Sequence, residues 1–212
     1  MERRAMNMVF TSLKKYRSIY LMVVSVVALS ACTQTPEKQS TDAPQARSMD
    51  NISVSAGDRE KYKEGLIALS YNDNDKAESI FNDFLEDKPE FAGPYTNLAL
   101  IQFKKKNYEQ SLELVNKALQ RNPQQAQAYQ LRAQILVSKG KIHDAENDYK
   151  KAIELKPDYI NAHYNLALLY DIYLQEIALA LKHYETYLSL IKKPDDATQE
   201  WVNHLKGTLA NG

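Results

Sequence analysis

The sequence predicts an all-α fold, a solenoid of about four helix-turn-helix repeats with a capping helix at its C-terminal end. A residue pattern recurs about every 34 positions, and a fixed period of this size is typical of solenoids. Within each period, apolar residues fall three and four positions apart, the spacing of one face of an α-helix. The first three periods each close on a proline, at Pro89, Pro123 and Pro157.

The pattern is clearest in residues 126–159. Its slots hold an aromatic residue, two small residues on either side of a short turn, and a bulky residue one helical turn further on. In this unit they are Tyr129, Ala133, Ala145 and Tyr149, and the counterparts elsewhere are Gly65, Ala77 and Phe81; Tyr95, Ala99, Ser111 and Val115; and His163, Ala167, Ala180 and Tyr184. The fourth unit matches throughout only if one inserted residue is allowed.

Each slot of this unit has a physical reason. Ala133 and Ala145 allow two antiparallel helices to approach closely, and Tyr149 fills the space beside them. The turn between the helices is short and contains Gly140, which suits a helical hairpin. Pro157 has no N–H group and disfavours helix at the preceding residue, so the second helix ends there. One hairpin cannot bury both of its faces, and stacked neighbours complete its core.

These residues resemble the motif of the tetratricopeptide repeat family, which has aromatic, small and proline positions at set offsets. The resemblance covers residues 58–193 and implies a right-handed solenoid. Its four repeats would occupy 58–91, 92–125, 126–159 and 160–193, with hairpins near 59–87, 92–121, 126–155 and 160–191.

The segment 194–212 is expected to cap the array. Trp201, Val202, Leu205 and Leu209 form an apolar stripe on a helix predicted over 198–210. A terminal repeat needs a cap with a polar outer face. Trp201 is interpreted as the anchor of this cap and not as a ligand contact.

The first 31 residues have the features of an export signal. Five basic residues and one acidic residue precede an apolar run at 19–29. This run is shorter than the roughly 20 residues of a spanning helix and falls within the range of a signal-peptide core. The whole chain holds 27 basic and 27 acidic residues, so removal of 1–31 leaves a net charge of −4.

The run ends at Leu29-Ser30-Ala31-Cys32, and Cys32 is the only cysteine. This sequence resembles the lipobox of bacterial lipoproteins, which implies lipidation of Cys32 and cleavage after Ala31. Several acyl chains on one cysteine would form a durable membrane anchor. Thr33 follows the cysteine, and by the sorting rule of such lipoproteins this implies the outer membrane. An ordinary signal peptide with an incidental cysteine and an uncleaved anchor remain the alternatives.

Residues 32–57 are predicted to be a disordered tether behind the lipid. They are polar and rich in Pro, Ser, Thr and Gln, so they cannot bury a core. A coil of this length spans on the order of 28 Å, enough to hold a small domain off a membrane.

The sequence lacks the residue patterns of known catalytic sites, so no enzymatic activity is predicted. The four histidines show no metal-ligand spacing, so no metal or other cofactor is expected. His163 is interpreted as a core residue, and His143, His183 and His204 as surface residues. No phosphate loop, nucleophile elbow or paired carboxylates are present, so no small-molecule substrate is predicted. The chain that remains after removal of 1–31 is mildly acidic and lacks a basic stripe, which also argues against binding of nucleic acid.

Protein binding is therefore the predicted activity. In the tetratricopeptide family the first helices of the repeats line a concave groove for peptides, and the resemblance places the groove at fixed positions of each repeat. These are Arg59, Tyr62, Leu66 and Leu69; Thr96, Leu100 and Phe103; Gln127, Gln130, Gln134 and Val137; and Asn161, Tyr164, Leu168 and Asp171. Apolar anchors and amide groups suit an extended or helical peptide. The basic residues with which some family members clamp a C-terminal carboxylate are missing, and ordinary helix packing is the alternative role for each single residue.

Taken together, these features resemble the lipid-anchored tetratricopeptide proteins of pilus and secretin systems. The resemblance implies a scaffold that faces the periplasm and assists assembly of a secretin or pilus subunit at the outer membrane. An adaptor that recruits cell-wall hydrolases or a periplasmic protease is a second hypothesis. A spacer for envelope maintenance without a fixed client is a third.

Overall fold

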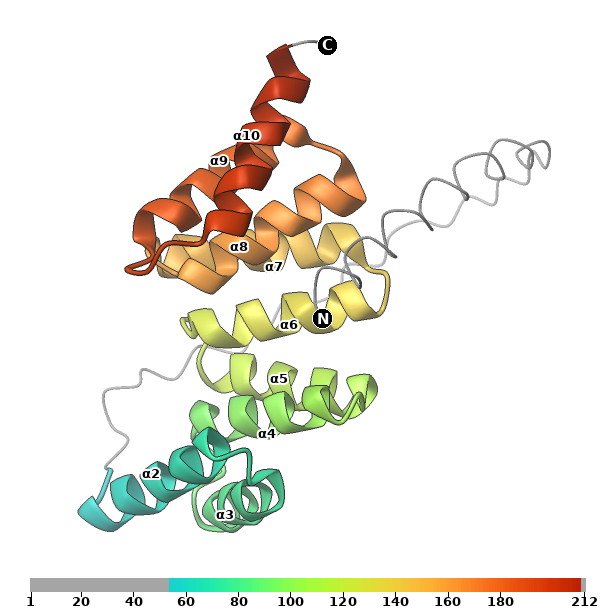
Figure 1. The fold of residues 1–212 in the computed structure, drawn as a ribbon. Coiled ribbons are helices and arrows are strands. Elements are labelled where there is room, and N and C mark those ends of the chain that lie inside the picture. Colours follow the sequence, from blue (N-terminus) through green and yellow to red (C-terminus); the bar gives the residue numbers. More distant parts are fainter. Residues whose placement is uncertain (1–53, 211–212) are drawn as a thin grey trace, which may run out of the picture. The chain divides into compact units, whose positions relative to one another are not determined.

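The computed structural model describes residues 54–210, and every regular element in this range is helical, which confirms the predicted all-α fold. The elements are α2 (Ala56–Ser70), α3 (Asn74–Asp87), α4 (Ala92–Lys104), α5 (Tyr108–Arg121), α6 (Ala126–Ser138), α7 (Ile142–Leu155), α8 (Ile160–Leu168), η2 (Leu169–Leu174), α9 (Ile177–Leu190) and α10 (Asp196–Ala210) (Figure 1). The expected signal segment, Cys32 and nearly all of the expected tether lie outside the described residues.

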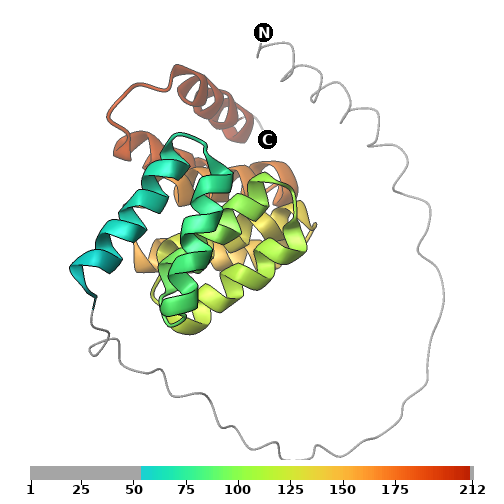
Figure 2. The same ribbon diagram turned by 90° about the horizontal axis from the view of Figure 1, so that it is seen from below.

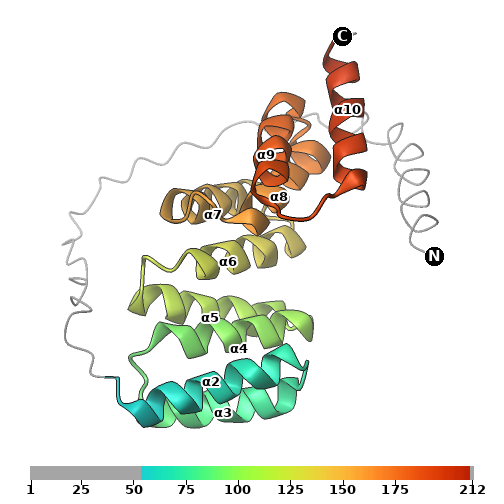
Figure 3. The same ribbon diagram turned by 60° about the vertical axis from the view of Figure 1, so that its left-hand side comes forward.

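The helices pair into four successive hairpins. Within the pairs α2 packs on α3, α4 on α5, α6 on α7, and α8 on α9. The second helix of each hairpin then packs on the first helix of the next, and Figure 3 shows this stacking in sequence order. Figure 2 looks along the stack from below, with the hairpin of α2 and α3 in front of the hairpins that follow. Such an arrangement buries a continuous core because each hairpin covers its neighbour.

Small residues permit the close contact inside each hairpin. Ala99, Ala133 and Ala145 are completely buried. In the first hairpin, a Cβ atom added to Gly65 would lie only 2.6 Å from Cε1 of Phe81, so the aromatic ring occupies the space that a side chain would need. Aliphatic and aromatic side chains therefore fill the core only where these small residues leave room.

A residue with positive φ ends the first helix of every hairpin. These residues are Asn72 (φ 58°), Lys106 (φ 63°), Gly140 (φ 72°) and Gln175 (φ 57°). The left-handed conformation lets a following N–H group reach back to the end of the helix, as from Lys141 N to Leu136 O at 2.9 Å. The same turn geometry thus recurs although only one of the four residues is glycine.

The residue inserted in the fourth repeat forms part of the π-helix η2. A π-helical turn holds one more residue than an α-helical turn. The closing bond runs from Glu176 N to Tyr170 O at 2.9 Å, one residue longer than its counterparts in the other repeats. The helix pair α8–α9 is therefore formed despite the insertion.

The last helix, α10, packs on α9 as a cap. Asp195 caps its N-terminus by accepting hydrogen bonds from the Thr198 backbone N–H (3.1 Å) and hydroxyl (2.7 Å). Val202 and Leu205 are buried, as the apolar stripe predicts. Leu209, the last residue of the stripe, is 48% exposed near the end of the helix.

The opposite end of the described array lacks a covering element. Ile67 is 46% exposed, whereas the residues in the same slot of the next two repeats, Ile101 and Ile135, are completely buried. Charged residues of α2 and α3 also lie at this end. Glu60 forms an ion pair with Lys63 (3.5 Å), and Glu64 forms one with Lys76 (3.1 Å). This end is therefore polar except for a few apolar side chains.

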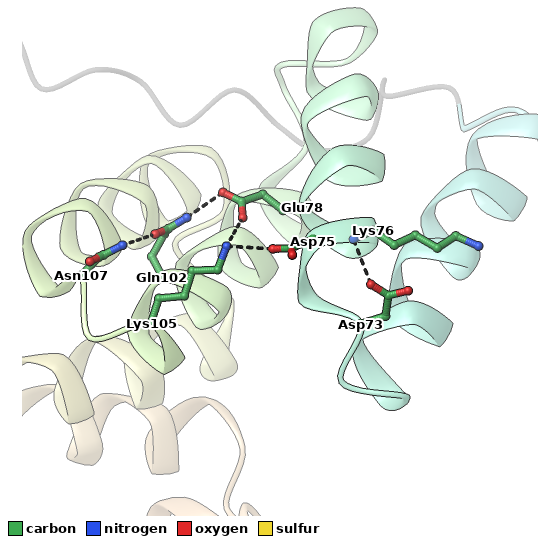
Figure 4. A network of polar contacts seen from close by, with 7 residues as sticks. All are labelled: Asp73, Asp75, Lys76, Glu78, Gln102, Lys105 and Asn107. Carbon is green, nitrogen blue, oxygen red and sulfur yellow. Dashed lines mark hydrogen bonds and ion pairs between the residues drawn. The ribbon is translucent and has the colours of Figure 1, made fainter.

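A polar network joins the first two hairpins (Figure 4). Gln102 is buried and donates to Glu78 Oε1 at 2.7 Å, while its own Oε1 accepts from Asn107 at 2.9 Å. Lys105 reaches back to Glu78 Oε2 at 2.8 Å and to Asp75 at 3.2 Å. The buried amide of Gln102 and the ammonium group of Lys105 are thus paired with side chains of α3 across the repeat boundary.

Another ion pair replaces apolar packing in the third repeat. Arg132 binds both carboxylate oxygens of Asp148, at 2.6 and 2.7 Å, and also donates to Asn116 at 3.0 Å. One repeat earlier, the same two slots hold Leu98 and Leu114, which both pack in the core. Arg132 and Asp148 are therefore a matched exchange for a leucine pair.

This exchange can be tested by restoring the leucines. We expect Asp148→Leu alone to lower the free energy of unfolding by about 2–3 kcal/mol, because it leaves the half-buried Arg132 without its carboxylate. The double variant R132L/D148L should return to within about 1.5 kcal/mol of the original protein, since it copies the packing of the second repeat. Urea unfolding monitored by circular dichroism gives both values. A double variant as unstable as the single one would contradict the matched exchange.

Candidate partner-binding face

The predicted groove residues lie on the first helices of the hairpins, except Asp171, which lies in η2 directly after α8, and we call them the first-helix face. Arg59, Leu66, Gln127 and Asn161 are exposed. Thr96 is buried, and the other members are partly buried. Because α4 and α6 also touch each other, the faces of neighbouring repeats adjoin there. The structure thus brings the residues of the central repeats together on one side of the hairpin stack.

At the N-terminal end, Tyr62 is mainly a packing residue. Its ring lies against Phe81 and Phe84, with centroid distances of 5.7 and 6.0 Å. Its hydroxyl accepts a hydrogen bond from Asn97 of the next repeat at 3.0 Å, and burial raises the pKa of Tyr62. Gly93 leaves the space for that hydroxyl, since a Cβ there would lie 2.7 Å from it. Leu66, 41% exposed, is the freer apolar contact at this end.

The amide groups in the middle of the face differ in their availability. Thr96 donates to Gln125 at 2.9 Å, and Gln130 accepts from the Tyr159 hydroxyl at 3.2 Å, so both side chains are already bound to the last residue of their own repeat. The side-chain amides of Gln127 and Gln134 make no hydrogen bond within the described part of the chain. These two amides therefore retain both donors and acceptors for a ligand backbone.

At the C-terminal end of the first-helix face, two predicted groove residues already make contacts within the protein. Oδ2 of Asp171 accepts from the Tyr184 hydroxyl at 3.1 Å and from Nε1 of Trp201 at 2.7 Å. Tyr164 packs its ring on Tyr187 at a centroid distance of 4.8 Å. Burial, together with the charge of Asp171, raises the pKa of Tyr184. Asp171 thus holds the cap through Trp201, and Tyr164 packs on α9, roles that the sequence pattern alone did not distinguish from ligand binding.

A pair of histidines lies between α8 and α9. Nε2 of His163 is 2.9 Å from Pro157 O, which can only accept, so this nitrogen carries a proton. Nδ1 of neutral His163 then accepts from Nδ1 of His183 at 3.1 Å. The ring of Tyr170 stacks on His183, with centroids 5.8 Å apart. The interpretation of His183 as a surface residue is therefore wrong, while His163 is buried as expected.

Residues 54–210 contain neither a cluster of metal-binding side chains nor a helix that could cross a membrane. In this range, no group of three or more His, Cys, Asp or Glu side chains could hold a metal ion. The helices formed by the same residues are too short or too polar to cross a membrane. What the face does offer is free amide groups next to exposed and half-exposed apolar side chains.

Comparisons with known proteins match this repeat architecture. Residues 68–135 match the family model described as Tetratricopeptide repeat, and residues 133–171 match the one described as TPR repeat. A sequence relative, DnaJ protein P58IPK homolog B from Oryza sativa subsp. japonica, is 42% identical over 52 residues, or 24% of this chain. The matched stretch spans only 11% of that relative, so the likeness concerns the repeats alone.

Solved structures support the same fold. The structure titled Functional Characterization of Pseudomonas Aeruginosa pilF is similar over 73% of this chain and 69% of that one, with a TM-score of 0.64 and 18% identity. The first TPR of Spaghetti (RPAP3), bound to the HSP90 peptide SRMEEVD, is similar over 56% of this chain and 93% of that one. Its TM-score is 0.51 and its identity 24%. At such identities the likeness shows the fold, a tetratricopeptide-type solenoid.

The histidine pair predicts a loss of stability in mild acid. Burial, and then the neighbouring His163, lower the pKa of His183 to about 4 from the ordinary 6.5. Because the unfolded chain takes up this proton at higher pH, the contribution is complete above pH 6.5 and is lost as the pH falls toward 4. We therefore expect the melting temperature to fall between about pH 7 and pH 5, where most carboxylates stay ionised.

The matched control is His183→Asn, whose amide can still donate to His163 but does not titrate in this range. Its melting temperature should depend less on pH over the same interval. Equal pH dependence in the two proteins would mean that His183 does not cause the loss.

Proposed function

We propose that this repeat protein is a lipid-anchored scaffold that faces the periplasm and binds a protein partner through the first-helix face, in the assembly of a pilus or secretin system. The proposal has three parts: binding by the repeats, anchoring by Cys32, and the identity of the partner. Each part has its own support and can fail without the others.

The proposal that the first-helix face binds a partner rests on the free side-chain amides of α6. The side-chain amides of Gln127 and Gln134 make no hydrogen bond within the described residues, and both residues lie on α6. An extended peptide needs hydrogen bonds for its backbone and apolar contacts for its side chains. The half-buried Leu100 and Phe103 and the exposed Leu66 can supply the apolar contacts. A similar fold, that of the RPAP3 repeat domain, was solved with a bound peptide.

The anchoring part rests on the sequence of residues 1–33. A basic segment, an apolar run of signal-peptide length and a lipobox-like end at Cys32 occur in the order that lipoprotein export requires. Thr33 favours the outer membrane by the sorting rule of such lipoproteins. A lipid at Cys32 would hold the repeats close to the membrane where a partner is assembled.

The choice of a pilus or secretin partner rests on the combination of lipobox and repeats. It is supported by the similarity of the fold to pilF, which extends over more than two thirds of both chains. An adaptor for a hydrolase or protease would use the same face, so the captured partner distinguishes the two roles.

The anchor can be tested by replacing Cys32 with Ala. Without a thiol to lipidate, we expect the protein to leave the membrane fraction, because no other strong membrane attachment is proposed. Fractionation of cells followed by immunoblotting measures this, with Thr35→Ala as a control that keeps the cysteine. Unchanged membrane association of Cys32→Ala would contradict the anchor.

The binding face can be tested by crosslinking and pull-down from intact cells. The variant L66E/Q127A/Q134A removes the exposed leucine and both free amides, and we expect it to lose the partner that the original protein captures. The matched control, L179E/Q110A/Q120A, makes the same changes at exposed positions of the second helices, where Leu179 is 39% exposed. It should keep the partner.

The identity of the captured protein decides among the roles. A secretin or pilus subunit supports the proposal, and a hydrolase or protease instead favours the adaptor. Capture of nothing by the lipidated protein favours the spacer. A partner that survives in the first variant would show that binding does not use the first-helix face.

A further inference from the structure

An open hollow of about 500 Å³ lies at the end of the fourth repeat. It is formed by the start of α8, the end of α9 and the loop that leads to α10. Ile160, Ile191 and the ring of Tyr187 supply apolar walls, and the exposed Lys192 and Lys193 also line it. The hollow therefore combines apolar surface with two ammonium groups.

The repeat pattern does not account for these two lysines. The earlier repeats end in Pro89-Glu90, Pro123-Gln124 and Pro157-Asp158, and the same loop position of the fourth repeat holds Lys192-Lys193. The helix that follows is also different, because α10 is steeply inclined to α8 (Figures 1 and 3). The dibasic loop and the changed direction of α10 occur together at the hollow.

Both lysines lack an ionic partner within the described residues. In contrast, Lys105 and Lys150 each lie within 2.8 Å of a glutamate oxygen. The carboxylate of Asp195 also lines the hollow, and its hydrogen bonds come from Thr198 at the start of α10 and from the Tyr187 hydroxyl at 2.9 Å. Two ammonium groups and one carboxylate thus line the hollow, which leaves its lining with a net positive charge.

We propose that this hollow binds an acidic peptide segment of a partner protein, with an apolar side chain of the peptide against Ile160 and Ile191. Carboxylates on either side of that side chain would pair with Lys192 and Lys193. The site lies apart from the free amides of α6, so it is a second recognition point that extends beyond the first-helix face. Charge complementarity of this kind contributes mainly to partner choice and to the rate of association.

A fluorescein-labelled peptide of glutamates around one central leucine is the probe, and its affinity is measured by fluorescence anisotropy. We expect K192E/K193E to weaken binding by about tenfold or more, because attraction becomes repulsion at both positions. The matched control is K141E/K182E, which reverses two other exposed lysines without ion pairs in the described region and gives the same net charge. It should bind as the original protein does, and added salt should weaken the interaction.

Several results would overturn the proposal. They are failure of the original protein to bind the probe, equal loss in the two charge-reversal variants, and equal affinity for a probe with the leucine replaced by glycine. Binding to vesicles of an anionic phospholipid, lost in K192E/K193E without binding to the peptide, would assign the lysines to a membrane surface instead. The variant L66E/Q127A/Q134A should still bind the probe, so this test is independent of the first-helix face.

Discussion

The close approach of two helices at a pair of small residues is the constraint on which the rest of the structure depends. In the first hairpin, Gly65 brings α2 so near to Phe81 that a methyl group would not fit. Alanine or serine takes this role in the other hairpins. The buried hydroxyl of Ser111 donates a hydrogen bond to Ala99 O at 2.7 Å. The turn between the two helices of a hairpin can close with one left-handed residue because the helices lie this close. The aromatic side chains then fill the space that remains between them.

Contacts between hairpins follow a second rule, in which polar substitutions occur as complementary sets. Arg132 occurs where a leucine would pack, and Asp148 and Asn116 both bind it. Lys139 reaches back to Glu109 of the preceding repeat, as Lys105 does to Glu78. A solenoid has no single central core, so each boundary must satisfy its own buried polar groups. Because polar groups are paired separately at each boundary, the sequence can vary widely while the architecture stays the same.

The sequence was sufficient for the features that repeat and insufficient for those that occur once. The slots of Ala133, Ala145 and Tyr149 could be predicted because the period supplied several examples of each. Nothing in the pattern indicated that the single insertion, in the fourth repeat, forms a π-helical turn, or that His183 pairs with His163. Position alone also could not show that Asp171 holds Trp201, whereas Gln127 remains free, since that difference depends on side chains from other elements.

The exposed slot of Ile67 means that the described array is stabilised unequally along its length. Inner hairpins are held from two sides, whereas α2 and α3 contact only one neighbouring hairpin among the described residues. Local opening should therefore require the least free energy at these two helices. Arg59 and Leu66 of the first-helix face belong to this least stable part, so a ligand that engages them also orders the helix that carries them. Occupancy would then slow amide hydrogen exchange in α2 and α3, and part of the binding free energy would be spent on local folding.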